Sequence, residues 1–97
     1  RPGLLLEIEA QSLDQVRDFL QMEGVDVIML DNLSPAEMTE AVALRGDKKV
    51  QFEASGGITL DTVAGVAATG VDFISVGALT HSAPALDLGL DIRIRTT

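Results

Sequence analysis

The sequence predicts an α/β domain in which short parallel strands alternate with helices. Near-continuous apolar runs, such as residues 25–30, are typical of parallel strands that are covered on both faces. The positions that end such runs recur every 22 to 24 residues, which is the length of one strand plus one helix. These positions are Glu9, Asp31, Ser55 and Gly77.

The first strand is expected at residues 4–10, which are apolar before two carboxylates appear. Ser12 and Gln15 have the spacing of a capping box, which predicts that a helix starts there. Gly24 is placed to end that helix. The buried face of the helix is expected from Leu13, Val16, Phe19 and Leu20.

The second strand is expected at residues 25–30, and it leads into Asp31 and Asn32. Ser34 and Glu37 form another capping box, with a proline at the first helical position, where its missing N–H has no cost. A glycine at position 46 closes the helix. The apolar stripe of this helix is Met38, Ala41 and Val42.

The third strand is expected at residues 50–53, and a helix should follow from near Thr59 to Gly70. Residues 72–76 form the fourth strand, and a short helix is expected around residues 84–86. In the tail, apolar and polar residues alternate with a period of two. This pattern predicts a strand with one solvent-exposed face, so the architecture of parallel strands covered on both faces changes there.

Composition bounds the function. The chain has 97 residues, so it is one domain or part of one. A net charge of −8 argues against a nucleic-acid surface. The sequence has no apolar run of about 18 residues, so no membrane-spanning helix is predicted. The absence of cysteine removes disulfides and thiolate metal sites and fits a cytoplasmic protein.

The four recurring positions should meet on one rim of the sheet. Consecutive β-α units have parallel strands and right-handed crossovers, so the carboxyl ends of the strands lie at the same edge. Active sites of parallel α/β folds lie at that edge. We therefore expect these positions, chosen from local sequence, to form one site.

Glycine turns on this rim predict phosphate binding. Ser55, Gly56 and Gly57 stand between a strand and a helical pattern, where free N–H groups and a close backbone approach suit a phosphate. Gly77 and Ala78 supply a second set of N–H groups on the next loop. An ordinary tight β-to-α turn is the alternative interpretation of the first stretch.

Three ionisable residues are candidates for the same site. Glu9 and Asp31 could hold Mg²⁺, directly or through water, or accept hydrogen bonds from sugar hydroxyls. The alternatives are a solvated carboxylate for Glu9 and an Asx turn for Asp31. His81 could pair with a phosphate or a carboxylate, or pack within its own loop.

Four segments resemble the C-terminal part of the quinolinate phosphoribosyltransferase family. They are residues 6–9 (Leu-Glu-Ile-Glu), 28–35 (Ile-Met-Leu-Asp-Asn-Leu-Ser-Pro), 53–60 (Glu-Ala-Ser-Gly-Gly-Ile-Thr-Leu) and 69–87, which contains the run Gly-Ala-Leu-Thr-His-Ser. The resemblance covers essentially the whole chain, and the last run is highly specific.

The resemblance implies a fold and an activity. The fold would be an incomplete TIM-like α/β barrel beside an α/β sandwich domain, with residues 1–87 supplying about four β-α units and residues 88–97 a tail strand that leaves the barrel for the sandwich. The activity would be magnesium-dependent transfer of phosphoribosyl from phosphoribosyl pyrophosphate to quinolinate, which yields nicotinate mononucleotide, carbon dioxide and pyrophosphate for NAD biosynthesis. The family forms dimers or hexamers.

Site residues follow from the same resemblance, motif by motif. Glu9 and Asp31 match the acidic residues near the ribose and the magnesium-pyrophosphate. His81 matches the histidine of the Leu-Thr-His motif. The loops around the 5′-phosphate are matched by Ser55, Gly56, Gly57, Val76, Gly77 and Ala78.

The chain departs from the family in what it lacks. The family's basic residues that hold the two carboxylates of quinolinate have no match here, so the chain alone is expected to bind phosphate weakly at most and to transfer nothing. Three alternatives stay open. These are a molybdenum-transport-associated sister protein, another phosphate-handling barrel such as an isomerase of amino-acid biosynthesis, and a non-catalytic half-barrel that binds a phosphorylated ligand or self-associates.

Overall fold

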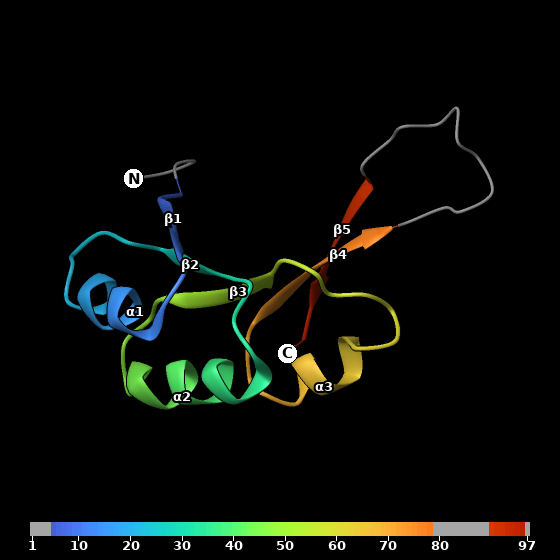
Figure 1. The fold of residues 1–97 in the computed structure, drawn as a ribbon. Coiled ribbons are helices and arrows are strands. Elements are labelled where there is room, and N and C mark those ends of the chain that lie inside the picture. The colour runs from blue at the N-terminus through green and yellow to red at the C-terminus, as the bar shows by residue number, and fades with distance from the viewer. Residues whose placement is uncertain (1–4, 79–89, 97) are drawn as a thin grey trace.

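A computed structural model describes residues 5–78 and 90–96, which form one five-stranded sheet and three helices (Figure 1). The strands follow one another in the sheet in chain order, β1-β2-β3-β4-β5, and only β5 runs antiparallel to its neighbour. The elements are β1 (Glu7–Ala10), α1 (Leu13–Leu20), β2 (Val27–Asp31), α2 (Pro35–Arg45), β3 (Gln51–Ser55), α3 (Val63–Ala67), β4 (Phe73–Ala78) and β5 (Leu90–Arg95).

The predicted α/β class with consecutive β-α units is confirmed, whereas the incomplete barrel stays a prediction. The tail was expected to leave for another domain. In this structure β5 pairs with β4 along six residue pairs, from Phe73 with Arg95 to Ala78 with Leu90. The switch from parallel to antiparallel pairing occurs where the sequence pattern changes, and the joining of residues 88–97 to a sandwich domain remains untested.

The three helices lie on the same face of the sheet, below it in Figure 1. Because side chains alternate along a strand, every second strand residue points into the core between the sheet and the helices. Ile28 and Leu30 of β2 are in that core, whereas Met29 between them is not. The fully buried large side chains are Phe52, Ile28, Leu30, Met38, Ile74, Val16, Val71 and Val76.

Both predicted helix caps form, with one difference. Ser34 Oγ accepts the Glu37 N–H at 3.1 Å and Glu37 Oε1 accepts the Ser34 N–H at 2.9 Å, which is a complete capping box. Ser12 Oγ accepts the Gln15 N–H at 3.2 Å, but the Gln15 side chain accepts the N–H of residue 11 instead of residue 12. Both strand-to-helix turns are therefore fixed locally.

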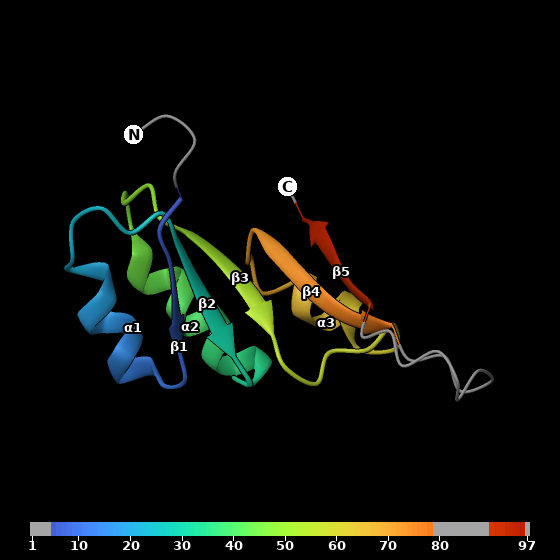
Figure 2. The same cartoon turned by 90° about the horizontal axis from the view of Figure 1, so that it is seen from above.

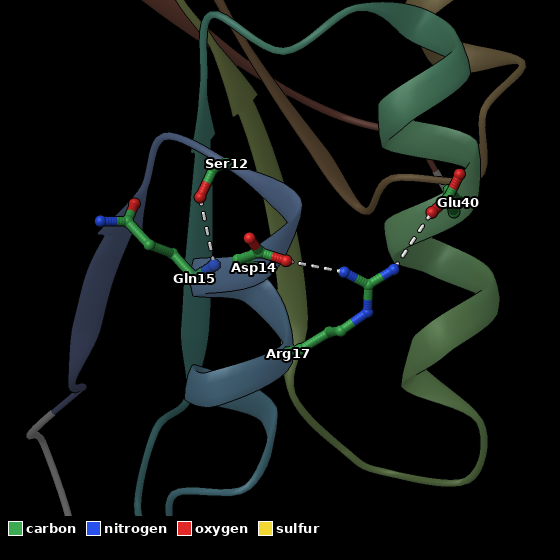
Figure 3. Close-up of polar contacts among 5 residues, drawn as sticks. All are labelled: Ser12, Asp14, Gln15, Arg17 and Glu40. Carbon is green, nitrogen blue, oxygen red and sulfur yellow. Dashed lines mark hydrogen bonds and ion pairs between the residues drawn. The ribbon is translucent and has the colours of Figure 1, made fainter.

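Helices α1 and α2 are tied together on the surface by one arginine (Figure 3). Arg17 donates to Asp14 at 3.0 Å within α1 and to Glu40 of α2 at 3.4 Å. All three side chains are exposed, so this contact contributes little to stability.

A more buried ion pair lies near the amino ends of β3 and β4. Arg45, at the end of α2, contacts Asp72 at 2.6 Å, and the two side chains are 19% and 14% exposed. Asp72 also accepts the Phe52 N–H at 2.9 Å, and the Arg45 guanidinium lies 5.2 Å from the centre of the Phe52 ring. One carboxylate thus joins α2, β3 and the start of β4.

The structure corrects two expected helix boundaries. The helix expected to start near Thr59 begins at Val63, because Thr59 and Thr62 form a separate turn with a 3.0 Å bond from the Thr59 N–H to Thr62 Oγ1. Helix α1 ends at Leu20, and Gly24 lies in the turn that follows, with φ of 88°.

The third strand extends to Ser55, beyond the expected residues 50–53. The short helix expected around residues 84–86 lies outside the described residues. Within the described part of the chain, no helix is long and apolar enough to cross a membrane.

Candidate functional site

The carboxyl ends of the four parallel strands lie along one edge of the sheet, and only β5 points the other way (Figure 2). This is the rim that the sequence predicted for the site. Asp31 and Ser55, the last residues of β2 and β3, are direct partners in the strand register. The acidic strand end and the start of the glycine turn are therefore neighbours.

The loop after β2 and the glycine turn after β3 contact each other closely. The Asn32 N–H donates to the Ser55 carbonyl at 2.8 Å. Gly56 and Gly57 both have positive φ, of 89° and 70°. A Cβ on Gly56 would lie 2.8 Å from Asp31 Oδ1 and 2.9 Å from the Asn32 nitrogen, so only glycine fits there.

The glycine turn is separated from helix α3. Ile58 follows the glycines and is buried, which anchors the turn to the core, and the turn from Thr59 to Thr62 comes next. Helix α3 has five residues and no side-chain cap. An anion at the glycine turn would therefore be held by loop N–H groups, and the helix N-terminus that the sequence suggested is not adjacent to them.

The two predicted carboxylates share one face of the sheet. Glu9 pairs in register with Met29, and Asp31 lies two residues beyond Met29, so both point away from the helices. Asp31 is half-buried, whereas Glu9 is exposed and accepts a 3.3 Å hydrogen bond from Gln11. In the ranges 5–78 and 90–96, no three His, Cys, Asp or Glu side chains are grouped so as to hold a metal ion.

A third carboxylate on this face was missed by the sequence analysis. Glu53 pairs in register with Met29 and is only 6% exposed. It stands two residues before Ser55 on β3, so the alternation of strand side chains could have placed it on the site's face. An acidic residue at that position lies on the same face of the sheet as the carboxylates predicted to meet the metal and the ribose.

The second predicted phosphate loop lies at the end of β4. The Val76 side chain is buried in the core, with 1% exposure, so only its backbone is available to a ligand. Gly77 and Ala78 end β4 at the same rim as Asp31 and Ser55. His81 lies outside the described residues.

Cationic side chains do not face this site in residues 5–78. Arg17 and Arg45 are engaged in the ion pairs described above. Lys48 and Lys49 are exposed in the turn before β3, at the opposite end of the strands. The site in this segment therefore combines carboxylates with backbone N–H groups. Such a combination suits a phosphate ester that carries hydroxyl groups and a bound metal ion.

A hollow of about 270 Å³ lies beside the two loops. Asn32, Gly56, Gly57 and Thr62 line it together with apolar side chains of α2 and α3. It borders the glycine turn on the side of the helices, so it is distinct from the face that carries Glu9 and Asp31.

Comparison with known proteins gives a consistent result. Residues 2–91 match the family model "Quinolinate phosphoribosyl transferase, C-terminal domain". The chain is 44% identical over 94 residues to the nicotinate-nucleotide pyrophosphorylase [carboxylating] of Mycobacterium leprae, and 41% identical over 91 residues to that of Rattus norvegicus. These alignments cover 94% and 92% of this chain.

A solved structure agrees with the sequence comparison. The nicotinate-nucleotide pyrophosphorylase of Francisella tularensis superposes with a TM-score of 0.70 and 38% identity over 80% of this chain. The chain spans about a third of the length of these relatives, namely 32% of the mycobacterial protein, 30% of the rat protein and 28% of the Francisella chain.

Proposed function

The chain belongs to the quinolinate phosphoribosyl transferase family, as its C-terminal domain, and from this premise we propose that it supplies the ribose-phosphate side of that enzyme's active site. The observation that carries the proposal is the pairing of Asp31 with Ser55, which sets a carboxylate beside a glycine turn. A phosphorylated sugar needs both kinds of group, acceptors for its hydroxyls and donors for its phosphate.

The proposed reaction joins the ring nitrogen of quinolinate to C1′ of phosphoribosyl pyrophosphate. The bond between C1′ and the pyrophosphate oxygen breaks, and pyrophosphate leaves with the electron pair. One ring carboxylate leaves as carbon dioxide, and a proton takes its place. The ribose carries positive charge in the transition state, which the carboxylates of Glu9 and Asp31 would stabilise from fixed positions on the sheet.

The phosphate side of the site would be built from backbone groups. Ser55, Gly56 and Gly57 would bind the 5′-phosphate through their N–H groups and the serine hydroxyl, with Val76, Gly77 and Ala78 on the neighbouring strand end. His81 would approach the same phosphate. Holding the phosphate fixes the distance between C1′ and the carboxylates, so that orientation contributes to the rate.

Magnesium belongs to this proposal. Glu9 and Asp31 supply hard oxygen ligands on one face of the sheet, which fits Mg²⁺ held by one or two carboxylates plus substrate oxygens and water. When bound, Mg²⁺ would neutralise the charge of the pyrophosphate group.

The partner substrate would be bound largely by other parts of the protein. Quinolinate carries two carboxylates, and residues 5–78 present no cation on the rim where Asp31 and Ser55 lie. We propose that the segments matching the other two thirds of the relatives supply those cations. A homodimer or hexamer and a cytoplasmic location are part of the same proposal.

A chimera tests this function. This chain would replace the matching third of the Mycobacterium leprae enzyme, and nicotinate mononucleotide would be measured from quinolinate and magnesium-phosphoribosyl pyrophosphate. We expect activity comparable to the parent, and a loss of about 100-fold or more in the Asp31→Asn chimera because a charge facing the ribose is removed.

The controls separate folding from function. Light scattering should give the chimera the same assembly as the parent enzyme. A chimera that assembles like the parent but forms no product would contradict the proposed transferase. The 97-residue chain alone should show no turnover, and product formation by it would contradict the idea that it carries only one side of the site.

A further inference from the structure

We propose that Asn32 is a positioning residue that holds the Asp31 carboxylate in register with the glycine turn of Ser55 to Gly57. The inference rests on the proposed function, because it assigns to Asn32 the geometry between the two parts of that site. Asn32 itself would contact neither phosphate nor metal, and it would act through Asp31.

The backbone of Asn32 is the first observation. Its φ is 63°, and it is the one non-glycine residue with positive φ among those the structure describes. Asparagine tolerates this left-handed conformation better than residues with bulkier side chains. The conformation is required here because Leu33 is already buried in the core and Ser34 already caps α2, so Asn32 is where the chain must turn.

The contact with the next strand is the second observation. The Asn32 N–H donates to the Ser55 carbonyl at 2.8 Å, which adds one bond beyond the Asp31 and Ser55 pair. This bond joins the loop after β2 to the residue from which the glycine turn starts. Because β2 precedes Asn32 while the buried Leu33 and the Ser34 cap follow it, a different φ at Asn32 would force one of these anchored segments to move and would strain the bond between the two loops.

The fit of Gly56 is the third observation. The space beside its Cα is occupied by Asp31 Oδ1 and the Asn32 nitrogen, which a Cβ would meet at 2.8 and 2.9 Å. The Asp31 carboxylate, the backbone N–H of Asn32 and Gly56 therefore fix one another's positions. The Asn32 side chain is exposed, so its contribution to core packing cannot explain why this residue stands here.

The experiment is a double-mutant cycle on the 97-residue chain, read out by NMR and by titration with magnesium-phosphoribosyl pyrophosphate. The variants are Asn32→Ala, Asn32→Gly, Asp31→Asn and the double variant Asp31→Asn with Asn32→Ala. Ala36→Ser, on the exposed first turn of α2, controls for any change near this helix.

Asn32→Ala should weaken binding by about tenfold, the size expected when a residue with a Cβ and no local polar group is forced into the left-handed region. Asn32→Gly should restore wild-type binding, because glycine adopts this φ freely. In the Asp31→Asn background Asn32→Ala should cause no further loss. Equal losses in both backgrounds would overturn the proposal, since they would mean that Asn32 does not act through Asp31.

Amide exchange reads the same geometry without a ligand. The backbone N–H of residue 32 should be protected from exchange in the wild type and in Asn32→Gly. In Asn32→Ala it should lose that protection, and the amide resonances of residues 55–57 should shift. Unchanged resonances in Asn32→Ala would also overturn the proposal. If no variant, wild type included, binds the ligand, the amide data decide whether Asn32 holds the loops together, and the chimera decides the proposed function separately.

Discussion

Single residues in this chain gain their roles from partners far away in the sequence. Arg45 and Asp72 are 27 residues apart, yet their side chains meet at 2.6 Å beside the Phe52 ring. Arg17 makes two ionic contacts on the surface, where water screens them, whereas Arg45 makes one in a more buried place. Burial, more than the number of contacts, should therefore separate the energetic value of the two arginines.

The substitution Asp72→Ala tests this difference. We expect it to lower the free energy of unfolding by about 3 kcal/mol, because Arg45 would keep its charge in a mostly buried place and the Phe52 N–H would lose its acceptor. Urea denaturation followed by circular dichroism measures the change.

Asp14→Ala is the matched control. It also removes the carboxylate partner of an arginine, since Asp14 lies 3.0 Å from Arg17, but the Asp14 side chain is 93% exposed. Its cost should be a few tenths of a kcal/mol. Similar losses in the two variants would mean that burial does not govern the strength of these ion pairs.

The helices of this fold differ in whether a side chain caps their first turn. Helix α2 starts at a complete capping box and is the longest of the three helices in the described residues, whereas α3 has no side-chain cap and is only five residues long. The difference lies in the first turn, where a cap satisfies N–H groups that have no partner within the helix. Helix α3 depends more on packing of Val63, Val66 and Ala67 against the core.

Ser34→Ala should lower the free energy of unfolding by about 1 kcal/mol, because the Glu37 N–H loses its acceptor at the start of α2. Ser34→Gly should cost only a few tenths of a kcal/mol, since glycine suits a helix start. Thermal or urea unfolding distinguishes the two. No loss in Ser34→Ala would show that the hydroxyl does not stabilise the start of this helix.

The turn after α3 offers a second matched pair. Gly70 has φ of 96°, and a Cβ there would lie 3.2 Å from Val42 Cγ1, so Gly70→Ala should destabilise the chain by about 1 to 2 kcal/mol. Gly65 lies inside α3 with open space beside its Cα, so Gly65→Ala should stabilise by up to about 1 kcal/mol. Unfolding midpoints that shift in the same direction would contradict this assignment.

The whole molecule is a sheet with helices on one face and an outer strand at β1 (Figure 1). Leu5 and Leu6, just before β1, are 75% and 45% exposed. An outer strand with apolar neighbours is a place where another strand can add. The chain by itself should therefore self-associate through this edge.

Light scattering of the isolated chain should show an apparent mass that rises with concentration, and Leu5→Lys should suppress the rise. Leu60→Lys is the control, because Leu60 is equally exposed, at 75%, but lies in the loop after the glycine turn. A monomer at all concentrations, or equal suppression by the two lysines, would contradict association through β1.

Much of the fold and part of the candidate site could be predicted from the sequence because the signals are local. Apolar runs and serine caps act over three or four residues, so the presence of the strands and the starts of α1 and α2 were predicted correctly, although the ends of the strands differ from the expected ones. Parallel order then placed Asp31 and Ser55 at the same rim. These conclusions needed no knowledge of which side chains touch.

Contacts between distant segments depended on the exact register of neighbouring strands, which no local pattern specifies. The register brings Asn32 to Ser55, buries Glu53 on the face of the site, and places Asp72 within reach of Arg45. The late start of α3 has a local origin instead, because Thr59 and Thr62 form a turn of their own before the helix begins at Val63. Local chemistry thus decides which elements form, and strand register decides which residues meet to make a site.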